Sequence, residues 1–273
     1  MAIRVGVGSG KAFDSREAGA LAAREALSRG NLHQADLALV FASSRYRQEE
    51  VLQGVASVLG NTTIVGCSTA GEITAQGAAE RSVAVMALAG PELRFQTGIG
   101  NGIGTDAREA GRQLARAVQV GGMEGAHALM ILPDGLAGNG ADIVRGIQDE
   151  LGATFPVVGG SAGDDYLFEK TYQMYRNQVT TGSVPGVLFG GAMSVGIGVR
   201  HGWQPLGLPR RVTRAEGARV YELDGRPAVT IYEDYFGRGA DELRQEPLAR
   251  MALVYPLGIP GEGENEYLIR DPL

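Results

Sequence analysis

The stretch Val65-Gly-Cys-Ser-Thr-Ala-Gly-Glu72 returns later in the chain as Val158-Gly-Gly-Ser-Ala-Gly-Asp164, with one residue of slippage. Each version directly follows a short apolar run, which predicts a buried β-strand. Ligands bind most often beyond the carboxyl ends of the strands in α/β sheets. These two stretches therefore decide both the expected fold and the expected site.

Further matches at one offset accompany this phrase. Ser15-Arg-Glu-Ala-Gly19 matches Ala107-Arg-Glu-Ala-Gly111, and Val51-Leu-Gln-Gly54 matches Ile143-Val-Arg-Gly146. Both pairs lie 92 residues apart (107 − 15 and 143 − 51). Several matches in the same order at one offset indicate an internal repeat, so we expect two copies of one unit.

Each copy predicts the order βαβαβ followed by two more strands. Continuous apolar runs are typical of parallel strands that are buried on both faces. We expect residues 1–200 to form one pseudo-symmetric α/β domain with a mixed sheet, built from copies at 3–100 and 96–200. In the first copy we expect a strand at Arg4–Gly8, a helix capped by Ser15, a strand at Leu37–Ala42, a helix from Gln48 that stops at Gly60, and a hairpin of Val83–Leu88 with Leu93–Gly100. In the second copy we expect a strand at Phe95–Gly100, a helix capped by Asp106, a strand at Ala128–Leu132, a helix from Ala141 that stops at Gly152, and a hairpin of Val187–Gly190 with Ala192–Val199.

The sequence changes character after residue 200. A connector punctuated by prolines, Trp203–Pro209, leads to apolar runs around Asp224-Gly225, a dipeptide that signals a chain reversal. About 70 residues give only a marginal core, so we expect 201–273 to be a smaller, incomplete α/β C-terminal domain. Its expected elements are strands at Arg211–Thr213 and Ala218–Leu223 and a helix at Ala228–Tyr235.

Composition excludes several classes of protein. The 273 residues are 44% hydrophobic and 21% charged with a net charge of −6, as in an ordinary globular protein without a basic nucleic-acid-binding surface. The sequence lacks a run of 18 apolar residues, which a membrane span would need. It also lacks a signal segment and has no second cysteine with which Cys67 could form a disulfide, so it does not predict secretion. We expect a cytoplasmic protein. Glycine is the outlier, with 42 residues against a usual share of about 7%, which predicts many tight turns and loops.

The two glycine stretches are candidate ligand loops. Their backbone N–H groups and hydroxyls can cradle a carboxylate or phosphate, while the acidic residues that follow can hold an ammonium group. An arginine on a neighbouring strand-end loop can clamp a carboxylate. Such a site suits an amino-acid zwitterion; the alternative is two tight turns whose serines cap their own backbone, beside a solvated arginine. The candidate ligand-binding residues are Ser68, Thr69, Glu72, Gly159, Gly160, Ser161, Asp164, Asp165 and Arg45.

Signals for an enzyme are weaker. The run Gly6-x-Gly8-x-Gly10 lacks the spacing of a dinucleotide-binding loop and indicates a strand-to-helix turn. A nucleophilic Cys67 or Ser161 would make the chain a hydrolase. The counterpart of Cys67 in the second copy is Gly160, which indicates a role for a small residue, and the sequence identifies no general base for Ser161. We therefore expect no catalytic residue and no enzymatic activity.

The histidines carry one alternative. None has metal-ligand spacing, so we expect no zinc or other metal site and no cofactor. His201 lies beside the only tryptophan, Trp203, and is by default an exposed loop residue. The alternative is that His201, or less directly His127, is the axial ligand of a noncovalent haem b, because one histidine in an apolar pocket suffices.

Three phrases together resemble one family. The runs Ile64–Ile73, Val157–Asp165 and Val212–Val229, with Tyr232, are similar in this order to the FIST family of bacterial sensor proteins. The first two resemble the FIST N-terminal domain and the third resembles the start of the FIST C-terminal domain. The resemblance implies an intracellular module of signal transduction that senses small ligands such as amino acids and acts with a histidine kinase or a cyclic-dinucleotide enzyme. It also implies the haem alternative, in which a nitric oxide sensor regulates a partner histidine kinase.

Overall fold

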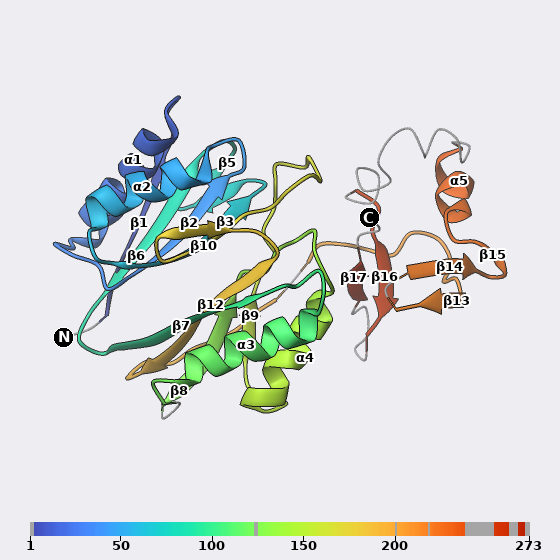
Figure 1. The fold of residues 1–273 in the computed structure, drawn as a ribbon. Helices are drawn as coiled ribbons and strands as arrows, with labels where there is room; N and C mark the ends of the chain where they lie inside the picture. The colour runs from blue at the N-terminus through green and yellow to red at the C-terminus, as the bar shows by residue number, and fades with distance from the viewer. Residues whose placement is uncertain are drawn as a thin grey trace. The chain divides into compact units, whose positions relative to one another are not determined.

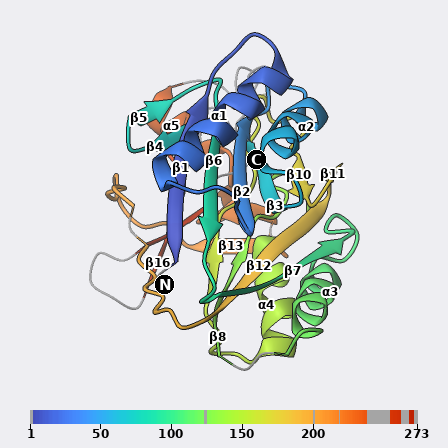
Figure 2. The same ribbon diagram turned by 90° about the vertical axis from the view of Figure 1, so that its left-hand side faces the viewer.

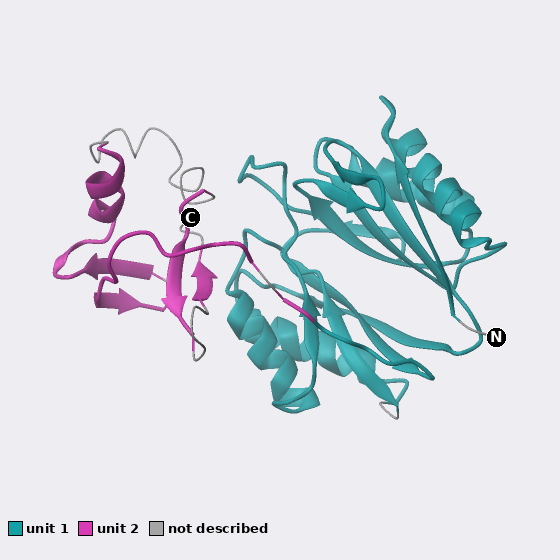
Figure 3. Cartoon of the chain, turned by 180° about the vertical axis from the view of Figure 1, so that it is seen from behind, with its two compact units in different colours: residues 1–197 teal, residues 198–273 magenta. Residues whose placement is uncertain are grey.

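The structure is a computed structural model that describes residues 3–122, 125–199, 201–217, 219–237, 254–261 and 267–270. The chain divides into two compact units, Met1–Ile197 and Gly198–Leu273, which Figure 3 colours separately. The elements of the first unit are β1 (Arg4–Gly10), α1 (Ser15–Gly30), β2 (Leu37–Ser43), α2 (Gln48–Leu59), β3 (Thr63–Thr69), β4 (Glu72–Thr74), β5 (Gly77–Ala79), β6 (Val83–Ala89), β7 (Leu93–Asn101), α3 (Ala107–Gln119), β8 (Ala126–Ile131), α4 (Gly140–Leu151), β9 (Val157–Gly159), β10 (Gln173–Tyr175), β11 (Gln178–Thr180) and β12 (Ser183–Gly191).

Two mixed sheets and the separate two-stranded sheet β4–β5 form the first unit, in agreement with the predicted α/β class (Figures 1 and 2). The first sheet has the order β1-β6-β2-β3-β10-β11, and the second has the order β7-β12-β8-β9. In each sheet one parallel pair, β2 with β3 or β8 with β9, follows antiparallel neighbours. The first four strands of the first sheet therefore have the same order and directions as the second sheet. Only the first sheet is extended, by the hairpin β10–β11 of the later half, which pairs with β3.

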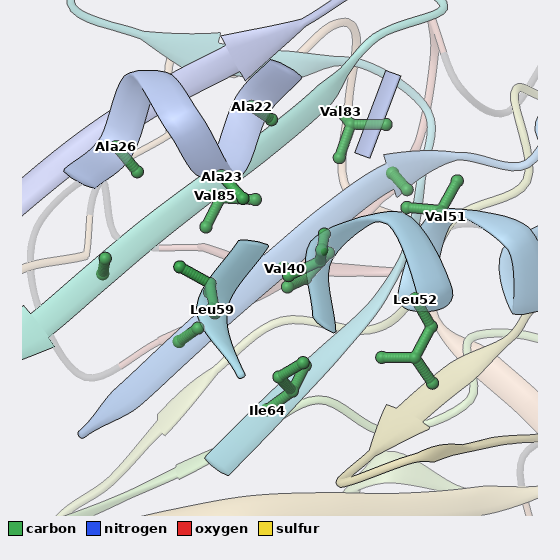
Figure 4. Packing of buried hydrophobic residues seen from close by; sticks show 14 of the residues in the cluster. Ala22, Ala23, Ala26, Val40, Val51, Leu52, Leu59, Ile64, Val83 and Val85 are labelled. Atoms are coloured by element: carbon green, nitrogen blue, oxygen red, sulfur yellow. The ribbon is translucent and has the colours of Figure 1, made fainter. Parts of the chain in front are cut away.

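The first unit has four layers, helix, sheet, sheet and helix (Figure 1). Small residues of α1 such as Ala26 pack with Val40 of the first sheet and with α2, as Figure 4 shows. A second cluster around Leu114 joins α3 and α4 to the second sheet. A third cluster, which includes Leu39 and Val187, joins the two sheets face to face.

Glycines bring the paired helices into backbone contact. A Cβ atom added to Gly54 of α2 would lie 2.0 Å from the carbonyl oxygen of Arg16 in α1. In the second helix pair, a Cβ atom on Gly146 of α4 would lie 1.9 Å from the carbonyl oxygen of Arg108 in α3. The two glycines are 92 residues apart (146 − 54), as are their partners. Side chains larger than hydrogen do not fit at either position.

The glycine-rich start of the chain has the same role. Gly6, Gly8 and Gly10 lie within β1 and face α1, where a Cβ atom on Gly8 would be 2.3 Å from the carbonyl oxygen of Ala22. The predicted strand-to-helix turn at these glycines is therefore wrong. These three glycines instead permit close packing of β1 on α1.

The helix ends follow the sequence signals with one change. Asp14 caps α1, because its side chain accepts from the amide of Glu17 at 2.8 Å, so the prediction of Ser15 as the cap is wrong by one residue. Asp106 caps α3, as predicted. Gly60 and Gly152 end α2 and α4 with φ of 65° and 100°, a region that favours glycine.

Both predicted hairpins are wrong. Strand β6 pairs with β1 and β2, whereas β7 pairs with β12, so the turn at Gly90-Pro91 carries the chain from one sheet to the other. The expectation that Phe95–Gly100 closes the first copy fails with it, since β7 belongs only to the second sheet. Residues 192–199 form no strand, so Val187–Gly190 has no hairpin partner there.

The described residues of the second unit form small sheets and one short helix. The turn at Asp224-Gly225 reverses the chain as predicted, with φ of 52° and 75°. Tyr232 is buried and donates to the carbonyl oxygen of Tyr255 at 3.0 Å. Among the residues described in both units, no helix is long and apolar enough to cross a membrane. The elements are β13 (Val212–Glu216), β14 (Arg219–Leu223), β15 (Arg226–Pro227), α5 (Thr230–Phe236), β16 (Leu257–Pro260) and β17 (Tyr267–Arg270).

Candidate functional site

The two glycine stretches of the sequence contact each other directly. Ser68, at the end of β3, is fully buried; its hydroxyl donates to the carbonyl oxygen of Gly163 at 2.6 Å and accepts from the amide of Tyr172 at 2.9 Å. The amide of Gly163 donates back to the carbonyl oxygen of Ser68 at 2.9 Å. A Cβ atom on Gly163 would lie 2.9 Å from the amide nitrogen of Ala70. Ser68 therefore holds the two halves together, and its hydroxyl is already engaged.

Glu72 is buried and its carboxylate is satisfied within the first half. One oxygen accepts from the hydroxyl of Thr69, and the other accepts from the amide of Ser82 at 3.1 Å and from its hydroxyl. In the second half, the side-chain oxygen of Gln173 accepts from the amide and hydroxyl of Ser183 at 3.4 and 3.2 Å. Both residues of the second pair lie 101 positions after those of the first (173 − 72 and 183 − 82). Gln173 is therefore the structural counterpart of Glu72.

Asp164, which the sequence phrase aligns with Glu72, has another role. Its carboxylate is buried and accepts from the amides of Phe168, Glu169 and Lys170 at 3.0, 2.7 and 3.1 Å. It thereby folds the loop 165–170, which the first half lacks. Three amide donors occupy this carboxylate, so it has little capacity left for a ligand ammonium group.

Asp165 joins this loop to the first half of the chain. Its Oδ2 atom accepts from the hydroxyls of Ser43 and Ser44 at 2.7 and 2.8 Å and from the amide of Arg45 at 3.3 Å. The residue has φ of 55°, and Tyr166 next to it has φ of 60°. Non-glycine residues rarely adopt this left-handed region, and such strain concentrates at functional sites.

Three polar groups at these loops keep unused hydrogen-bonding capacity. The Arg45 guanidinium is exposed and forms no ion pair with any residue that the structure describes. Within the same described ranges, the Oδ1 atom of Asp165 and the hydroxyl of exposed Ser161 have no hydrogen-bond partner. Gly159 and Gly160 are exposed beside Ser161 at the end of β9. A cation, a carboxylate oxygen and a hydroxyl therefore remain for a ligand.

The sequence reasoning missed Tyr172, Ser82 and the pair Gln173–Ser183. A usable signal existed, because Glu72 precedes Ser82 by ten residues and Gln173 precedes Ser183 by ten. It was hidden by the inserted loop, which changes the offset between the halves from 93 at Ser161 to 101 at Gln173.

Cys67, His127 and His201 are the side chains that the thiol and haem hypotheses name. Burial raises the pKa of the Cys67 thiol to about 12, so the reactive thiolate is scarce. His127 Nε2 lies 2.9 Å from a backbone carbonyl oxygen, and exposed His201 lies 2.9 Å from that of Tyr267. All described residues in the range 201–217 are exposed, so they do not enclose a haem around His201. Over the described ranges, no three His, Cys, Asp or Glu side chains gather as a metal site would require.

One family of proteins and several individual relatives match this chain. The FIST N domain matches residues 36–226, past the boundary at residue 200 that the sequence predicts and past the division of the structure after Ile197. An uncharacterised protein of Methanocaldococcus jannaschii is 28% identical over 246 residues, with 84% of this chain and 48% of the relative covered. An uncharacterised protein of Mycobacterium tuberculosis (strain H37Rv) is 32% identical over 294 residues, with 98% and 69% covered. The chain thus spans about half the length of the first relative.

Among solved structures, a cyanuric acid hydrolase from A. caulinodans matches with a TM-score of 0.39 and 10% identity, covering 70% of this chain and 68% of its own. A second cyanuric acid hydrolase structure matches with a TM-score of 0.34 and 11% identity.

Proposed function

Because the chain belongs to the FIST N domain family, a family of sensors in signalling, we propose that it binds a small amino-acid-like ligand at the loops where its two halves meet. The observation that supports this site is a fixed carboxylate, bound by the backbone amide of a residue whose own cationic side chain is unpaired. Three donors hold Oδ2 of Asp165, while the Arg45 guanidinium is exposed and has no ion pair among the described residues. Arg45 binds the ligand carboxylate in a bidentate manner. Oδ1 of Asp165 accepts from the ligand ammonium group, and Ser161 adds a hydroxyl.

The same loops offer a route from binding to signal. Loop 165–170 is fixed to the second half by Asp164 and to the first half by Asp165. A ligand that contacts Asp165 and Arg45 binds the conformations of this loop with different affinity, and therefore shifts their populations. A histidine kinase or a cyclic-dinucleotide enzyme in the cytoplasm reads the shifted state. The partner rests on the family resemblance alone, and the location rests on that resemblance and on the composition of the sequence.

Calorimetric titration with a panel of amino acids tests the site. Arg45→Gln removes the guanidinium but keeps the backbone amide that holds Asp165, so the loop stays folded. We expect affinity to fall about tenfold or more, because a hydrogen bond to a charged group contributes roughly 1.5–3 kcal/mol. Arg16→Gln is the matched control, since Arg16 is also exposed and has no ion pair among the described residues. Equal affinity in the two variants would overturn the assigned site.

The haem alternative makes a separate prediction. If His201 ligates haem b, purified protein shows a Soret band that His201→Ala removes. A colourless protein that gains no Soret band with added haem contradicts that alternative and leaves the amino-acid site unaffected. A hydrolase that uses Ser161 predicts stoichiometric labelling of that residue by a serine-reactive probe.

A further inference from the structure

An open hollow of about 570 Å³ lies in the first unit at the other end of the strands from the loops described above. Gln34, Ala35 and Asp36 precede β2, and Asn61 precedes β3, whereas the candidate loops follow these strands. The rest of the wall comes from the turn Gly90-Pro91 and from Leu93, Arg94 and Phe95 at the start of β7. Its size falls within the roughly 300–1,000 Å³ of small-molecule sites. We propose that this hollow is a second ligand site, for a planar aromatic carboxylate that also carries a hydrogen-bond donor.

Ala35, Leu93 and Phe95 give the hollow an apolar part within a lining that is otherwise mostly polar. Ala35 and Leu93 are buried, and Leu93 belongs to the cluster that joins the two sheets. Phe95 is half-buried and packs against the same cluster. An aromatic ligand gains both apolar burial and ring contact with Phe95. An aromatic ring can contact these three residues while the polar groups of the ligand meet the rest of the lining.

Opposite charges stand on the wall without pairing to each other. Asp36 is fixed, because its Oδ2 atom accepts from the amide of Gly90 at 3.0 Å and its own amide donates to the carbonyl oxygen of Leu88 at 2.8 Å. The Oδ1 atom of Asp36 and the Arg94 guanidinium have no side-chain partner among the described residues. Arg94 matches the planar fork of a carboxylate, and Asp36 accepts from a donor on the ligand.

Two amide side chains add specificity. Gln34 and Asn61 are exposed on the wall, and within the described residues neither forms a side-chain hydrogen bond. Each carries two N–H donors and one acceptor oxygen. A ligand with an anionic end and a donor end can pair with Arg94, Asp36 and the two amide side chains together. A ligand with two anionic ends is repelled by the Asp36 carboxylate.

The hollow takes residues from both halves of the first unit. Asp36 precedes a strand of the first sheet, and Arg94 and Phe95 begin the second sheet. A bound ligand therefore adds contacts across the seam between the sheets and raises the thermal stability of the unit.

Titration calorimetry with 4-aminobenzoate tests the proposal, because this probe carries a carboxylate, a ring and a donor. We expect Arg94→Gln to weaken binding about tenfold or more, and Gln34→Trp to abolish it by filling the hollow from an exposed position. Arg16→Gln is the matched control for Arg94→Gln and keeps the affinity of the unmodified chain. Benzoate, which lacks the donor, binds several-fold more weakly than 4-aminobenzoate.

Three results would overturn the inference: no binding of 4-aminobenzoate up to millimolar concentration, equal binding by Arg94→Gln and Arg16→Gln, or loss of binding in Arg45→Gln. The last result would place the probe at the strand-end loops. The two sites are independent, so Arg45→Gln tests the proposed function and Arg94→Gln tests the hollow. Circular dichroism of each variant separates lost binding from lost folding.

Discussion

The helix pairs of the first unit allow a sharp test of why the chain is so rich in glycine. Replacing Gly54 by alanine places a Cβ atom 2.0 Å from the carbonyl oxygen of Arg16. Ordinary contact begins at 3.4 Å, so α1 and α2 must separate by about 1.4 Å to accept one methyl group. Backbone atoms stand on both sides of this contact, and no side chain can rotate out of the way.

The expected cost follows from two opposing effects. Overpacking a close contact costs about 1–3 kcal/mol, and we take the upper end because backbone must move. Alanine regains about 1 kcal/mol of helix propensity relative to glycine. The free energy of unfolding of Gly54→Ala therefore falls by about 2 kcal/mol, which lowers the melting temperature of a unit of this size by about 4–8 °C.

Thermal unfolding followed by circular dichroism measures this change. Gly140→Ala is the control, because Gly140 begins α4 and a Cβ atom there meets no atom within 4 Å. Its melting temperature stays the same or rises by a few degrees. Gly146→Ala, with its contact at 1.9 Å to Arg108, destabilises the second helix pair to a similar extent. A melting temperature of Gly54→Ala equal to or above that of Gly140→Ala would refute the argument that glycine is needed for close helix packing.

Three further predictions follow from buried and paired groups. Glu72→Gln leaves the urea midpoint of unfolding nearly unchanged, because Gln173 makes the equivalent contacts in the second half. Glu72→Ala lowers the free energy of unfolding by about 1–3 kcal/mol, because buried donors lose their acceptor. Equal effects of the two variants would contradict the equivalence of Glu72 and Gln173. Hydrogen bonds from Arg108 and Arg112 lower the pKa of Asp149 to about 2 from an ordinary 3.8, so its stabilising effect is present above pH 4 and is lost as the pH falls through 4 towards 2. The difference in melting temperature between the unmodified chain and Asp149→Asn shrinks as the pH falls through this range, and a difference at pH 2 as large as that at pH 6 would argue against the ion pair. The buried Cys67 thiol, with its pKa raised to about 12, stays unmodified by a disulfide reagent at mildly alkaline pH until the chain unfolds; rapid labelling of the folded protein would show that it is accessible.

Much of the fold could be predicted from short-range sequence signals. The apolar run Leu37–Ala42 marks β2 to within one residue, and Gly60 marks the end of α2. Strand partners could not be predicted in this way. The turn Gly90-Pro91 signals a reversal, but no local signal says that β6 and β7 enter different sheets. That choice depends on the apolar contact between the two sheets, which involves residues far apart in the sequence.

The position of the glycine loops at strand ends could be predicted, but the contacts of their side chains could not. The strand-end loops were found because the repeated phrase follows two apolar strands. The use of each carboxylate depends on the folded loop: Asp164 binds three amides of its own loop, and Asp165 reaches Ser43 at a separation of 122 residues. The Glu72–Ser82 contact was missed because the inserted loop moves its counterpart out of register.

The hairpin β10–β11 has a consequence for how the chain is made. Strand β3, complete at Thr69, keeps one side of its backbone unpaired until Gln173–Tyr175 has been synthesised and added to it. For the intervening hundred or so residues, the nascent chain carries an open strand edge of the kind that pairs with other chains. The earlier half therefore cannot complete its own sheet as it leaves the ribosome. A gene cut between the halves would yield an N-terminal fragment prone to aggregation, although that fragment holds both helices and most strands of its sheet.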